Sequence, residues 1–159
     1  MDGPELEVGR YVGATGQPTV VLPGLSQRRV IPISDYTVVN LKEVDDSAGD
    51  NAALEAHFGR KHLDSEHLGV SHFRAGPGFR SEKGHSHREQ EEVYIVVAGS
   101  GRIKLNDEIV ELRPWDAIRV APATVRALEA GPDGLEFIAV GTDRPEGGDG
   151  MQTENFWDS

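Results

Sequence analysis

The residues with the clearest chemical potential lie close together in residues 84–101, which read GHSHREQEEVYIVVAGSG. His85 and His87 are two positions apart. Because side chains alternate between the two faces of an extended chain, we expect both imidazoles on one face. Glu92 begins the apolar run that follows, and the same alternation puts Tyr94 on the face of Glu92. If that face points into a barrel, two imidazoles and one carboxylate converge there.

Two histidines and one carboxylate on one side of an ion form an arrangement that suits Fe(II) and admits Mn, Zn, Ni or Co. Such a site leaves positions open for a substrate. Buried imidazole and carboxylate groups are also candidates for general acid or base work, since their surroundings can shift the pKa toward neutral pH. A His-x-His pair in a solvated loop is the plain alternative.

Composition narrows the function classes. The 159 residues are enough for one domain, and the absence of cysteine excludes disulfides, thiolate metal sites and cysteine nucleophiles. Sixteen basic and 27 acidic residues give 16 − 27 = −11, a charge that repels nucleic acid and anionic membranes. The first residues lack the pattern of a signal peptide, and no apolar run approaches the roughly 20 residues of a membrane span. We therefore expect a cytoplasmic protein with neither nucleic acid nor membrane as a partner.

From residue 68 onward, short apolar runs alternate with turn residues at close intervals, which predicts an antiparallel sandwich or barrel of about eight strands. The turn sequences include GSG at residues 99–101 and GPDG at residues 131–134. The strands are predicted at residues 68–75, 92–98, 102–105, 108–112, 117–121, 124–130 and 135–141.

Upstream, residues 38–44 are predicted to form a strand, and one short helix should follow. Asp50 is its expected N-cap, Leu54 and Phe58 lie four apart on one face, and Gly59 ends it. The predicted organisation is an extension or strand-bearing arm at 1–36, with β-like pieces at 18–22 and 28–33, a barrel at 37–145 and a tail at 146–159. His57, His62, His67 and the acidic turn at residues 89–91 are expected at the surface.

One stretch resembles the first motif of the cupin superfamily. It reads His85, x, His87, four residues, Glu92, six residues, Gly99. The resemblance covers roughly residues 70–141. It implies an all-β, cupin-type antiparallel β-barrel, also called a double-stranded β-helix or jelly roll, here with one short helix. Cupin-like chains are commonly homodimers, so the resemblance also implies a homodimer.

The second cupin motif is matched less completely by RPWDAIRVAPATVRAL at residues 113–128. Trp115 and Ala123 stand where the family usually has glycines, and Arg126 stands where it usually has its last histidine ligand. Arginine stays cationic and has no lone pair to offer a metal. The four-ligand site that the resemblance implies is therefore incomplete.

Three outcomes follow from the arginine. An ion could remain on His85, His87 and Glu92 while Arg126 grips an anionic substrate. Alternatively, Arg126 could pair bidentately with Glu92 and compete with the cation for its carboxylate. Finally, the barrel could bind a small ligand with no metal at all.

The resulting hypothesis is a small-molecule pocket formed by His85, His87, Glu92 and Arg126, with Tyr94 as a further ligand contact. In its enzyme form, a divalent metal ion (Fe, Mn, Zn or Ni) supports an oxygenase, isomerase or lyase that acts on a small anionic organic substrate. The alternatives are a metal-free, non-catalytic barrel in which Arg126 pairs with Glu92, and a dimeric scaffold. The residues assign no catalytic group.

Overall fold

The computed structural model describes residues 9–12, 18–21 and 36–158. Strands β1 (Gly9–Val12) and β2 (Pro18–Val21) form an antiparallel pair, and β2 falls on the strand predicted at residues 18–22. The piece predicted at residues 28–33 lies outside the described residues.

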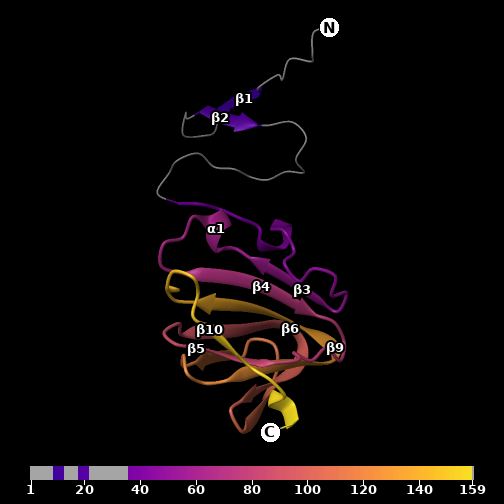
Figure 1. The fold of residues 1–159 in the computed structure, drawn as a ribbon. Helices are drawn as coiled ribbons and strands as arrows, with labels where there is room; N and C mark the ends of the chain where they lie inside the picture. Colours follow the sequence, from indigo (N-terminus) through magenta and orange to yellow (C-terminus); the bar gives the residue numbers. More distant parts are fainter. Residues whose placement is uncertain (1–8, 13–17, 22–35, 159) are drawn as a thin grey trace.

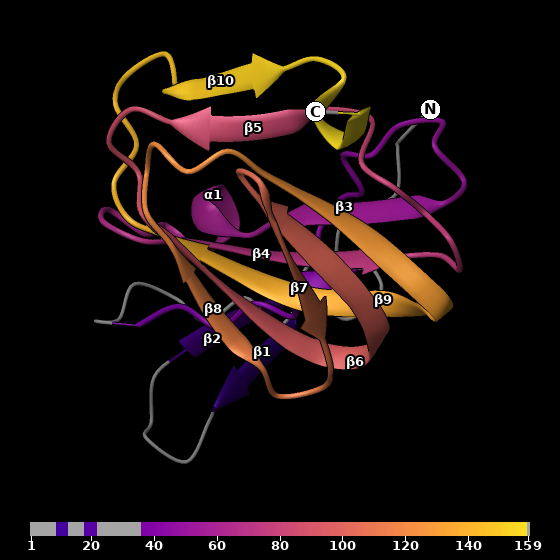
Figure 2. The ribbon, with the colours of Figure 1, turned by 90° about the horizontal axis from the view of Figure 1, so that it is seen from below.

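A single eight-stranded antiparallel sheet forms the body of the protein (Figure 1). Its order is β10-β5-β9-β4-β3, and β6 pairs with β7, β8 and β9. Figure 2 shows how the sheet curls, with the β10–β5 pair across from β3 and β4. The strands are β3 (Leu54–Phe58), β4 (Gly69–Ala75), β5 (Gly84–His87), β6 (Glu92–Leu105), β7 (Glu108–Leu112), β8 (Ala117–Val120), β9 (Arg126–Gly141) and β10 (Gly150–Thr153). The all-β prediction is confirmed.

Strands β6 and β9 are longer than predicted and form the spine of the barrel. Each continues through a sequence that was predicted to be a turn, GSG in β6 and GPDG in β9. Gly99 pairs with Leu135 and Gly101 with Ala130, so residues 131–134 have no partner in the β6–β9 ladder. The ladder between them instead shifts register near Gly99. Gly99 has a φ of 79°, and a Cβ on it would lie 2.1 Å from the carbonyl oxygen of Gly134. Here the glycines allow a bulge that bends a continuous strand, rather than a turn that ends it.

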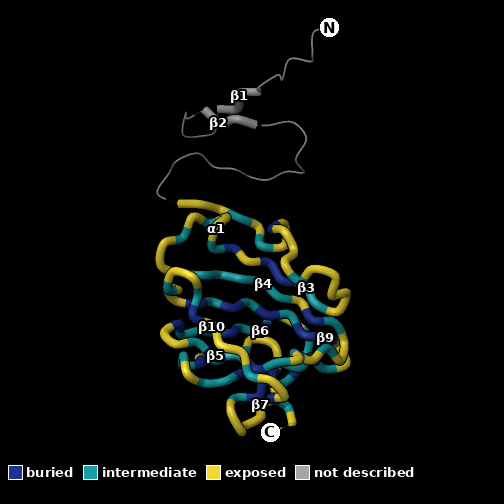
Figure 3. Tube along the Cα trace, in the orientation of Figure 1, coloured by how far each residue is buried: buried dark blue, intermediate teal, exposed yellow. Residues whose placement is uncertain are grey.

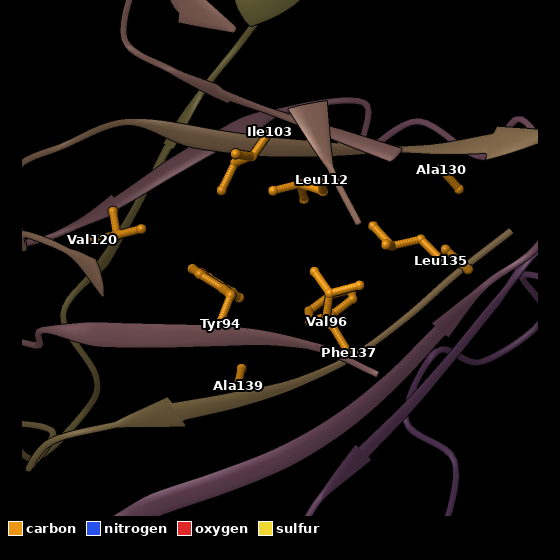
Figure 4. Packing of buried hydrophobic residues seen from close by; sticks show 10 residues of the cluster. Tyr94, Val96, Ile103, Leu112, Val120, Ala130, Leu135, Phe137 and Ala139 are labelled. Atoms are coloured by element: carbon orange, nitrogen blue, oxygen red, sulfur yellow. The ribbon is translucent and has the colours of Figure 1, made fainter. Parts of the chain in front are cut away.

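The hydrophobic core lies inside the curl. Val96, Ile103 and Leu135 are among its most buried side chains, and Figure 4 shows them in one cluster with Tyr94 and Phe137. In β6 the buried positions include Tyr94 and Val96, and in β9 they recur with the period of two from Leu135 to Gly141, as a strand requires. Figure 3 shows exposed residues gathered at the loops. This alternation is what turns the Glu92 and Tyr94 face inward.

The predicted helix after Asp50 is wrong, because residues Leu54–Phe58 form β3 and pair with β4. Leu54 and Phe58 share a face in a strand as well as in a helix, so their spacing did not discriminate. The only α-helix among the described residues is α1 (Arg60–Leu63), which follows Gly59. The strand predicted at residues 38–44 is also wrong, since this segment contains the 3₁₀ turn η1 (Leu41–Glu43).

A second 3₁₀ turn, η2 (Phe156–Asp158), lies near the C-terminus, where no helix was expected. No helix in the described part of the chain is both long and apolar enough to cross a membrane. His62 and His67 are exposed as predicted, but His57 is buried, which corrects the surface prediction. Its Nδ1 lies 2.7 Å from the carbonyl oxygen of Val44, and its ring stacks on His72.

Candidate functional site

Strand β5 and the first residue of β6 bring together the three residues of the histidine motif. One donor atom each of His85, His87 and Glu92 lies within 4.8 Å of the other two, and we call these three residues the His-His-Glu cluster. Glu92 Oε2 lies 3.4 Å from His87 Nε2 and 3.8 Å from His85 Nε2. The convergence expected from strand alternation is therefore present in the structure.

His87 is held from behind by Asp149, a residue that the sequence did not single out. His87 Nδ1 lies 2.8 Å from Asp149 Oδ1, and the other carboxylate oxygen accepts hydrogen bonds from the main-chain N–H groups of Glu89 and Gln90. A carboxylate accepts hydrogen bonds, so His87 carries its proton on Nδ1. Nε2 is then the nitrogen of His87 that faces the cluster, 3.4 Å from Glu92 Oε2.

Asp149 itself is buried. Burial alone would raise its pKa, but the N–H groups of Gln90 and Glu89 and the His87 ring outweigh that effect and lower the pKa to about 2. Asp149 immediately precedes β10, which pairs with β5 in register, so that Gly150 lies opposite His87. The segment predicted as a tail thus supplies a residue to the site. No motif spacing could have found it, because only the β5–β10 pairing brings it near His87.

The turn between β5 and β6 is less exposed than predicted. Gln90 is buried, because its main-chain N–H donates to Asp149 and its side-chain Nε2 donates to the carbonyl oxygen of Thr142, 2.8 Å away. Glu89 is exposed as expected, and Glu91 pairs with Arg119. The turn is therefore an anchored link between the two strands that carry the cluster.

Arg126, the first residue of β9, is fully buried and contacts the cluster through Glu92. Its Nη2 donates to Glu92 Oε2 at 2.5 Å, and its Nε donates to the hydroxyl of Tyr94 at 3.3 Å. Nη1 donates to the main-chain oxygens of Thr124 and Pro122. The ion pair with Glu92 is present, but it uses one carboxylate oxygen rather than the two that a bidentate pair requires.

Tyr94 completes this arrangement by donating its hydroxyl hydrogen to the same Oε2 of Glu92 at 2.6 Å. Burial would raise the pKa of Glu92, but His85, Tyr94 and Arg126 outweigh it and lower the pKa to about 2. Burial, together with the neighbouring Glu92 charge, raises the pKa of Tyr94 well above its ordinary value. At neutral pH, Glu92 is therefore an anion and Tyr94 a hydrogen-bond donor.

The fit of a divalent cation can be judged from His87 Nε2. This atom is buried and has no hydrogen-bond partner among the described residues, although buried polar atoms are normally paired. Donor atoms bound to one ion at about 2.1 Å with tetrahedral angles lie roughly 3.4 Å apart, which is the separation of His87 Nε2 and Glu92 Oε2. The same Oε2 accepts the hydrogen bonds from Tyr94 and Arg126, so a cation would share this oxygen with both donors. The donor set fits a cation, with Arg126 as a competitor for Glu92.

The His-His-Glu cluster and Tyr94 line a cavity of about 830 Å³ in the barrel. Arg126 is not one of the lining residues, because it lies behind Glu92 and Tyr94. Much of the remaining wall is apolar and comes from β3, β4 and β9, including Leu54, Phe58, Phe73, Leu135 and Phe137. The volume is in the usual range of small-molecule sites, about 300–1,000 Å³.

No protein-family model matches the sequence, and no curated protein matches it either. Several solved structures are similar in fold. A cupin protein from Bacteroides fragilis is 22% identical over 70% of this chain and 86% of its own, with a TM-score of 0.59. The polyketide cyclase RemF from Streptomyces resistomycificus is 19% identical over 76% of this chain and 85% of its own, with a TM-score of 0.61.

A third similar structure is oxalate decarboxylase from Bacillus subtilis, with 24% identity and a TM-score of 0.52. The match covers 62% of this chain but 27% of the decarboxylase chain. The likeness in all three cases is one of fold, and the two proteins whose names give an activity, a polyketide cyclase and an oxalate decarboxylase, differ in that activity.

Proposed function

Because the chain has the cupin fold, we propose that its barrel binds a small organic molecule beside a divalent metal ion held by His85, His87 and Glu92. The observation that carries the proposal is the orphaned Nε2 of His87. It is buried, faces the other two residues of the cluster, and has its partner nitrogen fixed by Asp149. A carboxylate on the far nitrogen is the usual way in which proteins orient a metal-binding imidazole.

A bound divalent ion would supply a Lewis acid in a site with positions open to an oxygen of the ligand. The other roles belong to the chain itself. Asp149 fixes the tautomer of His87, and Tyr94 and Arg126 keep Glu92 ionised. His85 has 43% of its side chain exposed, so a ligand in the cavity can reach it. The activity proposed is that of an oxygenase, isomerase or lyase.

The Arg126–Glu92 ion pair favours a second candidate function, a metal-free barrel that binds a small molecule without catalysis. Arg126 already neutralises the one carboxylate of the cluster, and a cation placed near a guanidinium is repelled. In this alternative, the His-His-Glu cluster contacts the ligand directly through hydrogen bonds.

Metal analysis of protein purified without a histidine tag separates the two candidates. The first predicts a stoichiometric divalent metal in the wild type, and its loss in His85→Ala and Glu92→Gln. His67→Ala is the matched control, because His67 is exposed and pairs with Asp143 away from the cluster. Substoichiometric metal that both cluster substitutions leave unchanged would contradict the metal site and support the metal-free barrel.

A further inference from the structure

The cavity has a row of aromatic side chains along one wall. Phe58, Phe73, Phe137 and Tyr94 follow one another across β3, β4, β9 and β6, with neighbouring ring centroids 5.6, 4.9 and 5.9 Å apart. All four line the cavity. Phe58 is 50% exposed, whereas Tyr94 is 4% exposed and contacts Glu92. The row therefore leads from the solvent-exposed end of the cavity to the His-His-Glu cluster.

Aromatic rings in a core normally pack against other side chains on both faces, and this row instead borders an open volume of about 830 Å³. A flat apolar ligand body lying on such a wall gains from burial and from ring contacts, about 0.5–1.5 kcal/mol for each aromatic pair. The wall therefore favours a ligand with an aromatic body over a small, fully polar one.

The charged residues of the cavity lining differ from the chain as a whole. The protein has a net charge of −11, but its lining contains the cations Arg60, Lys61 and Arg144 against the acids Asp45 and Glu92. Arg126 is not available to a ligand, since it is fully buried and donates to Glu92, Tyr94 and two main-chain oxygens. The sequence hypothesis that Arg126 grips an anionic substrate is therefore not supported by its position.

Two cations of the lining, Arg144 and Lys61, are left for a ligand among the described residues, and Arg144 is the one that also adjoins His87. Arg60 is engaged by the main-chain oxygens of Glu66 and Thr142 and lies near Asp143. Arg144 is exposed and has no hydrogen bond or ion pair with the residues that the structure describes. It lines the cavity, and together with His87 and residues 147–151 it also lines a second hollow, so it adjoins the cluster at His87.

We propose that the ligand of this barrel is an amphipathic organic anion, with its aromatic body on the Phe73–Phe137 wall and its anionic group at Arg144. The proposal rests on the proposed function as a small-molecule site, and it names the class of that small molecule. Lys61 of α1, also exposed and part of the lining, adds positive charge at the opening. An anionic group at Arg144 gains a charge-assisted contact that a neutral group does not.

The test compares three probes of the same shape, 2-naphthoate, 2-naphthalenemethanol and 2-naphthylmethylamine, by calorimetric titration of the full chain with and without EDTA. We expect the wild type to bind naphthoate about tenfold more tightly than the neutral alcohol and to bind the amine most weakly, with a preference that shrinks at high salt. Arg144→Gln should weaken naphthoate binding about tenfold and leave alcohol binding within about twofold.

Arg113→Gln is the matched control, because it removes the same charge from an exposed arginine on the β7–β8 turn, outside the cavity. Equal losses of naphthoate affinity in the two variants would overturn the assignment of Arg144. Failure of the wild type to bind naphthoate would overturn the ligand class. Metal content, measured on the same samples, reports separately on the proposed function, so a stoichiometric metal without naphthoate binding refutes this inference alone.

Discussion

Replacing Arg126 with methionine tests the electrostatics of the site most directly. The environment lowers the pKa of Glu92 from 4.5 to about 2. At about 1.4 kcal/mol per pKa unit, this difference is worth about 3 kcal/mol of preference for the charged form in the folded state. Methionine removes the fully buried partner and leaves Glu92, whose side chain is only 15% exposed, without its ion pair. His85 and Tyr94 also lower the pKa of Glu92, so this shift is shared among three residues. Leaving one partner of a buried ion pair unpaired typically costs about 3–5 kcal/mol, and we expect the free energy of unfolding to fall by about 3 kcal/mol at pH 7.

The pH dependence follows from the direction of this shift. A carboxyl group with a lowered pKa in the folded state stabilises the protein above its unfolded pKa, and this contribution is lost as the pH falls through the folded value. The wild type should therefore exceed Arg126→Met in stability most at neutral pH. The difference should shrink between pH 4.5 and about pH 2, the two pKa values of Glu92.

Urea unfolding followed by tryptophan fluorescence in EDTA provides the measurement, because Trp157 is half-buried and donates its indole N–H to the main-chain oxygen of Ser81. A double-mutant cycle with Glu92→Gln isolates the pair from the hydrogen bonds that Arg126 makes to Thr124 and Pro122. A coupling energy below about 0.5 kcal/mol, or a stability difference that does not change with pH, would refute the reasoning.

Two further substitutions test the support of the site and the bend of the barrel. Asp149→Asn should weaken zinc binding about 10- to 100-fold in chelator competition, because His87 loses the carboxylate that orients it. Asp116→Asn is the control and should leave zinc binding unchanged, since Asp116 is a remote turn aspartate that also accepts a main-chain hydrogen bond. Equal zinc affinities in the two variants would count against the orienting role of Asp149. Gly99→Ala should lower the free energy of unfolding by more than about 2 kcal/mol in urea, since its Cβ meets the Gly134 carbonyl oxygen. Gly78 has a φ similar to that of Gly99, but nothing lies within 4 Å of the position that its Cβ would take, so Gly78→Ala should cost about 1 kcal/mol. Equal losses of stability in the two variants would mean that the Gly99 effect comes from backbone strain alone.

Several features of the fold could be predicted because they depend on short-range geometry. The strands after residue 68 were recognised from alternating apolar residues and turn chemistry, and β4, β7 and β8 lie within a residue of their predicted bounds. The errors fall where one local pattern suits two structures. Leu54 and Phe58 satisfy both helical and extended spacing, and pairing with β4 decides between them. Gly99 suits a turn or a bulge, and the β6–β9 ladder makes it a bulge.

The candidate site divides in the same way. The sequence by itself determined that His85 and His87 lie on one side of their strand and that Glu92 and Tyr94 lie on one side of theirs, because alternation in a strand is a local property of the backbone. Their meeting on one inward face was predicted on the condition that the strands form a barrel. Only the tertiary structure decided what surrounds that face. It brings Asp149 behind His87 through the β5–β10 pairing, and it buries Arg126 against Glu92 instead of turning it toward a ligand. It also leaves Arg144 as an exposed cation of the cavity lining. These contacts depend on strand pairing between distant segments, which no residue spacing within one segment encodes.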